Sequence, residues 1–215
     1  AAVAVSNARL YAAQQAEAYV TTALLQVAEA VNAQVQESEA LEMISRLTAL
    51  LAGVSRCLIL RWDADERAYY VSAQYGIARE PFAGLLGVPI RAEEHPLLDL
   101  LSVADRPLGA GAQYQLPTPE PLARLLPASA IMCFPLRARG GLVGLLVVDE
   151  PRRSTNPRLI SVLTGIAHQT ATVLETANLQ ASAVERERLE QELEVARSIQ
   201  ASFIPDAPPQ LPGWQ

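Results

Sequence analysis

The spacing of apolar residues near the start of the chain predicts an amphipathic helix from Leu10 to Val31. One stripe repeats at steps of three and four residues and is formed by Leu10, Ala13, Glu17, Val20, Leu24, Val27 and Val31. This heptad matches a coiled-coil seam, except that Glu17 places a charge in it. Two interpretations stay open: the stripe pairs with a second chain, or the helix lies on its own domain.

A second helix is expected from Glu39 to Leu51. Ser38 can cap its first turn, and Gly53 is a natural stop after its last turn. Its apolar face is formed by Leu41, Ile44, Leu47 and Leu51.

Beyond Gly53 the pattern changes to one typical of β-strands. The first pair of strands is expected at 56–62 and 67–75, and the second pair at 129–137 and 142–149. The second pair is apolar on both faces, so both of its faces should be covered. Pro135 cannot donate a ladder hydrogen bond, which predicts a bulge at this position.

The region between the two strand pairs, residues 78–126, is irregular and rich in proline. Short helices are plausible only at His95 to Leu101 and Pro121 to Leu126. A long irregular insert in a compact domain is typical of a lid or a binding loop.

A long helix is predicted from Pro157 to Ile204, because Asn156 can cap it and neither proline nor glycine occurs between Gly165 and Pro205. At ~1.5 Å per residue it would span roughly 70 Å, so its distal half should need a partner helix. A heptad stripe runs through Leu163, Ala167, Thr170, Leu174, Ala177, Ala181 and Val184, and a second one through Leu189, Leu193, Ala196 and Phe203. The break near Glu185 to Arg188 indicates either a local change of coiled-coil register or an ordinary solvated face.

Composition narrows the functional classes. Half of the 215 residues are apolar, and the formal charge is -6, with arginine supplying every positive charge because lysine is absent. That balance argues against nucleic-acid binding. We see neither a signal peptide nor a membrane span, and two cysteines do not make a disulfide scaffold, so a cytoplasmic location is expected.

The sequence contains no readable catalytic or metal-binding constellation. Asp149 and Glu150 are more simply interpreted as part of a turn than as an acid–base pair, and His168 is expected to be an ordinary helix residue. Cys57 and Cys133 lie in predicted strands, where a small buried apolar side chain is the simplest interpretation. We therefore expect no enzyme activity and no cofactor in this chain.

The order of elements over Ser38 to Ala181 resembles the GAF family of sensory domains. The sharpest match is the strand hairpin, where Phe134-Pro135-Leu136 and Val143-Gly144-Leu145 stand at the family's characteristic positions. The resemblance implies an α+β fold, with a GAF-like central antiparallel sheet that has helices on one face and a small-molecule pocket on the other. Long N- and C-terminal signalling helices would flank it. The absence of lysine speaks against the family's cyclic-nucleotide branch, and motifs around a bilin-binding cysteine are missing.

The C-terminal tail carries a second resemblance. Ala196 to Pro205, with Leu211-Pro212-Gly213-Trp214, is similar to the entry of SpoIIE-like, metal-dependent (PPM) serine/threonine phosphatases. This implies a phosphatase domain further along a longer chain, with Mn or Mg bound only there. The expected organisation is an N-terminal signalling helix (1–36), a GAF-like domain (37–181), a coiled-coil linker (182–204) and the start of the phosphatase domain (205–215).

These expectations lead to named residues. If a pocket exists, its walls should come from strand side chains that face away from the helices, namely Arg61, Trp62, Tyr70, Met132 and Phe134; plain core is an equal alternative. The seam of a parallel homodimer is expected at Leu10, Val20, Leu24, Val27, Val31, Leu174, Ala181, Val184, Leu189 and Leu193.

The leading functional hypothesis is a sensory and dimerisation module that regulates the downstream phosphatase. A stand-alone small-molecule-binding protein and a purely structural dimeriser are the alternatives. Under all three hypotheses, neither nucleic acid nor a membrane is expected as a partner.

Overall fold

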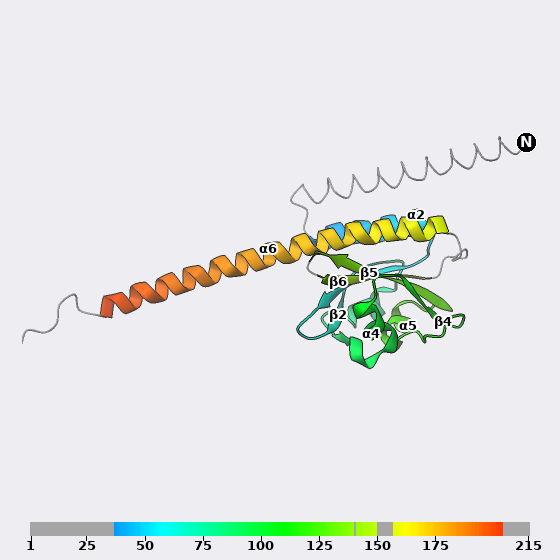
Figure 1. Cartoon of the computed structure of the whole chain (residues 1–215), viewed down its shortest axis with the longest axis horizontal. Helices are drawn as coiled ribbons and strands as arrows, with labels where there is room; N and C mark the ends of the chain where they lie inside the picture. Colours follow the sequence, from blue (N-terminus) through cyan, green and yellow to red (C-terminus); the bar gives the residue numbers. More distant parts are fainter. Residues whose placement is uncertain (1–36, 140, 150–156, 204–215) are drawn as a thin grey trace, which may run out of the picture. The chain divides into compact units, whose positions relative to one another are not determined.

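The fold was analysed in a computed structural model that describes residues 37–139, 141–149 and 157–203, with side chains described from 159 to 200 in the last segment. Within these residues the chain forms a six-stranded antiparallel sheet of order β3-β2-β1-β6-β5-β4. Figure 1 shows α2 and the first part of α6 on one face of this sheet, and α4 and α5 on the other. The α+β fold class with a central antiparallel sheet, predicted from the sequence, is confirmed, but helices lie on both faces of the sheet and not on one.

The four long strands match the sequence-based expectation closely. They are β1 (Cys57–Asp63), β2 (Ala68–Tyr75), β5 (Ala130–Ala138) and β6 (Gly141–Asp149). Strands β1 and β6 are central in the sheet order. Residues of β5 and β6 belong to buried clusters on both faces of the sheet, as predicted for this strand pair from its apolar composition.

Short elements fill the irregular region. They are α3 (Arg79–Ala83), β3 (Ile90–Arg91), the 3-10 turn η1 (Ala92–Glu94), α4 (Pro96–Val103), β4 (Leu108–Gly111) and α5 (Glu120–Leu125). The helices α4 and α5 confirm the two expected helical stretches. The sequence pattern did not reveal α3, β3 or β4, because elements of two to five residues are too short to show a period.

Two long helices flank the strands in the sequence. Helix α2 spans Glu37–Ala52, so Ser38 lies in its first turn and the prediction that it caps the helix is wrong. Helix α6 spans Pro157–Phe203 and continues without interruption through Glu185 to Arg188. Asn156, the predicted cap of α6, lies outside the described residues.

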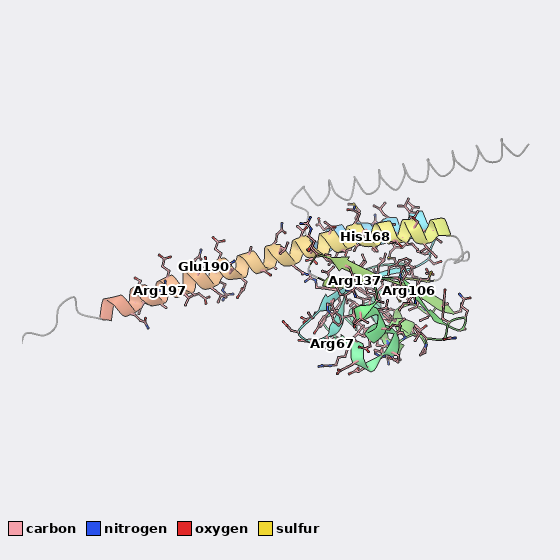
Figure 2. The ribbon with its side chains drawn as sticks, viewed as in Figure 1. Arg67, Arg106, Arg137, His168, Glu190 and Arg197 are labelled. Atoms are coloured by element: carbon pink, nitrogen blue, oxygen red, sulfur yellow. The ribbon has the colours of Figure 1, made fainter. Side chains whose placement is uncertain are left out.

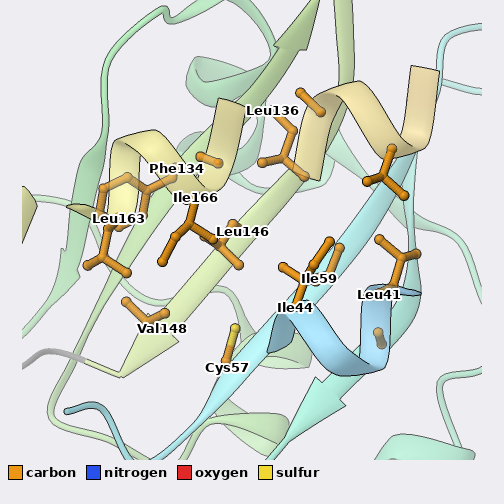
Figure 3. Close-up of a cluster of buried hydrophobic side chains, with 14 of the residues drawn as sticks. Leu41, Ile44, Cys57, Ile59, Phe134, Leu136, Leu146, Val148, Leu163 and Ile166 are labelled. Atoms are coloured by element: carbon orange, nitrogen blue, oxygen red, sulfur yellow. The ribbon is translucent and has the colours of Figure 1, made fainter. Parts of the chain in front are cut away.

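The first core cluster lies between the sheet and the two long helices (Figure 3). Leu41 and Ile44 of α2 and Leu163 and Ile166 of α6 meet alternate residues of the strands. The strand residues of this cluster include Cys57, Ile59, Phe134, Leu136, Leu146 and Val148. Their two-residue spacing assigns the faces of β1, β5 and β6.

Gly144 allows close contact at the centre of the sheet. A Cβ atom at this position would lie 2.3 Å from the carbonyl oxygen of Leu60 and 3.0 Å from Cδ1 of Leu174. The first distance is far below van der Waals contact, so a larger residue would push β6 away from β1. The glycine of the resemblance motif is thus required by packing.

Pro135 lies where β5 has lost one of its neighbours. The pairing of β5 with β4 ends at Cys133, while its pairing with β6 continues to Ala138. The register shift between β5 and β6 falls between Leu136 and Arg137. The predicted bulge therefore exists, one residue later than expected.

Candidate functional site

The lid-side face of the sheet, which α4 and α5 cover, is where the family resemblance implies a ligand pocket. Of the five predicted wall residues, Trp62 packs against the cluster on this face. Its ring lies 4.6 Å from that of Tyr69 at an interplanar angle of 54°. Tyr69 is fully buried, and its hydroxyl donates a hydrogen bond to the carbonyl oxygen of Leu98 in α4 at 3.4 Å.

The other four predicted wall residues do not join Trp62. Met132 and Phe134 belong to the cluster between the sheet and the long helices, so the prediction that they face away from the helices is wrong. The reason is that β5 is apolar on both faces, and alternation alone does not say which set faces which layer.

Arg61 and Tyr70 are neighbours across β1 and β2, and neither belongs to the cluster on the lid-side face. The guanidinium of Arg61 forms an ion pair with Glu37 of α2. Tyr70 donates its hydroxyl hydrogen to the Glu66 carboxylate, and this bond raises the pKa of the Tyr70 hydroxyl. Both side chains therefore have local partners of their own.

Side chains of the protein pack densely beneath the lid. Six leucines of α4 and α5 and of the residue directly after α5 are at most 1% exposed. They are Leu97, Leu98, Leu101, Leu122, Leu125 and Leu126. They meet Ile131, Cys133, Leu145 and Val147 of the sheet. A ligand on this face would have to displace part of this packing, because protein interiors leave few voids.

A groove of about 250 Å³ lies at the edge of the sheet beyond the end of β4. Three elements contribute its walls: the loop after α4, the end of β5, and α6. The lining residues are Asp105, Pro107, Phe134, Pro135, Arg137, Thr164, Ala167 and His168. Figure 2 locates Arg137 and His168. This lining combines apolar residues with the polar side chains of Asp105, Arg137, Thr164 and His168.

Arg137 makes three polar contacts with the segment that follows α4 and with its last turn. Its Nη2 donates to the carbonyl oxygen of Ser102 at 2.9 Å, and its Nε donates to that of Ala104 at 3.0 Å. Nε also lies 2.8 Å from Oδ1 of Asp105. Arg137 was not among the predicted site residues, although an arginine near the end of an otherwise apolar strand was a usable signal.

A second, smaller hollow of about 190 Å³ lies beside β2. It is lined by Glu42, Arg46, Ser72, Ala73, Gln74, Tyr75 and Phe82. Apart from Ala73 and Phe82 its lining side chains carry polar groups, and none of them was predicted from the sequence.

The two cysteines and His168 lie apart from one another in the described part of the chain. Cys57 and Cys133 are buried free thiols, as expected, and they lie in clusters on opposite faces of the sheet. Burial raises the pKa of Cys57 to about 12 and raises that of Cys133 as well. His168 is exposed on α6. Within the described residues, no group of three or more His, Cys, Asp or Glu side chains could hold a metal ion.

Asp149 has a structural role that the sequence did not reveal. Its Oδ1 accepts hydrogen bonds from the backbone N–H groups of Ser55 at 3.0 Å and Arg56 at 2.9 Å. It also forms a 3.9 Å ion pair with Arg56. Asp149 thus fixes the turn between α2 and β1.

The predicted seam residues divide into three groups. Leu174 is 0% exposed and packs in the core of its own domain, so its assignment to a dimer seam is wrong. Ala181, Val184, Leu189 and Leu193 are exposed. Leu10, Val20, Leu24, Val27 and Val31 lie outside the described residues.

A membrane span requires a helix that is both long and apolar. No helix of the described residues combines the necessary length with the necessary apolar character.

Comparison with known proteins places these features in a family. The family model described as "GAF domain" matches residues 36–174. A search of the curated proteins finds no significant match.

Several solved structures are similar to this chain. The GAF domain of a phosphoenolpyruvate-protein phosphotransferase (ptsP) from Coxiella burnetii matches with a TM-score of 0.62 and 16% identity, covering 76% of this chain and 96% of that one. The GAF domain of a putative sensor histidine kinase from Pseudomonas syringae pv. tomato matches with a TM-score of 0.58 and 17% identity, covering 82% and 99%. Residues 122 to 287 of a methyl-accepting chemotaxis protein match with a TM-score of 0.56 and 19% identity, covering 74% and 99%.

At these identities the structural matches show the fold, and the family model covers well over half of the chain. This chain therefore belongs to the GAF domain family of sensory and signalling domains.

Proposed function

We propose that this chain is a non-catalytic sensory and dimerisation module whose output passes through α6. The observation that supports this most strongly is a set of apolar side chains on α6 beyond Glu175 that are 50–67% exposed. They are Leu179, Val184, Leu189, Leu193, Val195 and Ile199. A solvated helix with so many exposed apolar residues gains stability when a partner covers them.

The partner is a second copy of the chain. Leu189 and Leu193 are four residues apart and occupy neighbouring seam positions, while Arg188 and Glu192 form a 3.0 Å ion pair along the helix. In two parallel copies joined at these leucines, Glu192 of one copy would lie near Arg197 of the other, because such positions flank a parallel seam. This complementarity favours the parallel arrangement.

The test is the mass of the full 215-residue chain in solution at tens of micromolar. The Leu189→Glu and Leu193→Glu double variant places four acidic groups in the seam of a dimer, and we expect it to be a monomer. The Gln191→Glu and Ser198→Glu double variant adds the same charge at other exposed positions of the helix, and we expect it to remain a dimer. Equal masses for wild type and both variants would contradict the proposal.

We infer that the domain controlled by this module is a SpoIIE-like, metal-dependent serine/threonine phosphatase. The support is the resemblance of Ala196 to Pro205 and Leu211 to Trp214 to the entry of that domain. The experiment is an assay of the longer chain for Mn- or Mg-dependent release of phosphate from a phosphoserine peptide. Lack of activity with both metals would contradict this part of the proposal, while the dimerisation test would stand separately.

The dense packing under the lid favours a second candidate, a dimerisation module that senses no small molecule. The leucines of α4 and α5 cover the position where a ligand would bind. Native mass spectrometry of the chain purified from its expression host distinguishes the two. A bound small molecule supports the ligand sensor, and a bare protein mass supports the structural module.

A further inference from the structure

The edge groove is lined by residues from both sides of the sheet. On β5, even-numbered residues such as Phe134 face the long helices, and odd-numbered residues such as Cys133 face the lid. Because β4 pairs with β5 only as far as Cys133, the next part of β5 is paired with β6 on one side and has no strand on its other side. Here Asp105 and Pro107 from the lid side and Thr164 and His168 from α6 line the same groove.

Arg137 stands at this opening and ties down the end of α4. Helix α4 ends at Val103, and its last carbonyl groups lack partners within the helix. Arg137 donates to one of these late carbonyls, that of Ser102, and to the carbonyl of Ala104 directly after the helix, and it places a positive charge at the negative end of the helix. The ion pair with Asp105 adds little, because Asp105 is 86% exposed.

The remaining attachments of α4 are apolar packing and two weaker polar contacts. Leu97, Leu98 and Leu101 pack on the sheet. Arg67 forms a 3.2 Å ion pair with Asp99 in which both side chains are more than half exposed, and the Tyr69 hydroxyl bonds to Leu98 at 3.4 Å. The charge-assisted bonds of Arg137 are therefore the strongest polar link between α4 and the sheet in the described structure.

We propose that Arg137 is a latch that couples the lid helix α4 to α6 around the open edge of the sheet. When α4 moves, the guanidinium loses the Ser102 and Ala104 carbonyls, and the loop that carries Asp105 and Pro107 shifts. That loop and α6 both line the groove, so we expect the displacement to reach α6 without crossing the packed sheet. The inference rests on the proposed function only in taking α6 as the output helix.

The first arm of the test removes the latch and observes α6. Hydrogen–deuterium exchange of the full chain is measured for Arg137→Met, Arg137→Lys and the control Arg106→Met, which removes an exposed arginine from the same loop. For Arg137→Met we expect about tenfold faster exchange in the last turn of α4, and faster exchange in residues 164–168. Arg137→Lys should have a smaller effect, because an ammonium group lacks the fork that bridges two carbonyls.

The second arm perturbs the groove from α6 and observes α4, because an energetic coupling is reciprocal. His168→Trp enlarges the side chain at the groove, and Ser161→Trp introduces the same residue at an exposed position of α6 outside it. We expect faster exchange in the last turn of α4 for His168→Trp alone.

The outcomes separate the alternatives. Faster exchange confined to α4 in the first arm, or equal effects of the Arg137 and Arg106 variants, would overturn the coupling. If Arg137→Met does not fold, Arg137→Lys and the second arm decide, and unchanged exchange in both would overturn it. Neither readout depends on the mass of the assembly, so a failed latch is distinguishable from a failed dimer.

Discussion

Leu174 and Leu179 lie five residues apart on α6, and they should respond very differently to truncation. Leu174 is 0% exposed and belongs to the core beneath the long helices, whereas Leu179 is 66% exposed. We therefore compare Leu174→Ala with Leu179→Ala in the full chain.

The expected loss for Leu174→Ala follows from its surroundings. At ~0.8 kcal/mol per buried methylene, removing three carbons costs about 2.4 kcal/mol. A cavity adds to this because the central strands at Gly144 are held too closely to relax, which brings the total to about 3–4 kcal/mol. For a domain of this size the melting temperature should fall by roughly 10 °C. Leu179→Ala should change the stability of the domain by less than about 0.5 kcal/mol.

Urea unfolding followed by circular dichroism, at one fixed protein concentration, measures both values. Solution mass is recorded for each variant. The reasoning would be refuted if Leu174→Ala cost less than about 1 kcal/mol and also reduced the solution mass, because Leu174 would then act in a seam and not in the core.

Three further predictions test the packing, the hydrogen bonds and the titration of the domain. Gly144→Ala should destabilise the domain by about 3 kcal/mol, because the new Cβ meets the Leu60 carbonyl. Gly165→Ala, with open space around the new Cβ, should stabilise α6 by about 0.5–1 kcal/mol. Thermal melts that rank the two variants the other way would contradict the packing account. Asp149→Ala should cost about 2–3 kcal/mol and Asp149→Asn about 1 kcal/mol, since asparagine keeps one acceptor for the Ser55 and Arg56 amides, and equal urea midpoints would argue against this role. Burial raises the pKa of Cys57 to about 12 and raises that of Cys133 as well, so the thiols of the unfolded chain ionise at lower pH than those of the folded chain. The part of the free energy of unfolding that depends on these thiols should therefore be constant below pH ~9 and decline above it by up to about 1.4 kcal/mol per pH unit and thiol. A thiol reagent should label both cysteines only in denaturant, and rapid labelling of the native protein would oppose the prediction.

The elements that the sequence predicted are those with a strong period or a specific turn. Short apolar, β-compatible runs separated by turn residues predicted the four long strands, and the proline at position 157 marked the start of α6. Gly144 was recognised from its motif, and the structure supplies the reason, which is the Leu60 carbonyl.

The errors arose where two environments produce one pattern. Leu174 and Leu189 both occupy heptad positions, yet the first is buried in its own domain and the second is 50% exposed, because a repeat of apolar residues does not state what covers them. Met132 and Phe134 were assigned to the wrong face because their strand is apolar on both sides. Arg137 was missed because its partners are backbone carbonyls 33 and 35 residues away, which side-chain patterns do not report.

The central proposal is that two copies of α6 pair in parallel through the apolar positions around Leu189. Mild oxidation of a Leu189→Cys variant tests it most directly, with Gln191→Cys, on the outer side of the predicted seam, as its matched control. The native cysteines are buried and should not interfere. The account predicts that Leu189→Cys forms a disulfide-linked species of twice the 23.2 kDa chain mass while Gln191→Cys stays uncrosslinked, and a Leu189→Cys protein that remains a single chain of 23.2 kDa would contradict it.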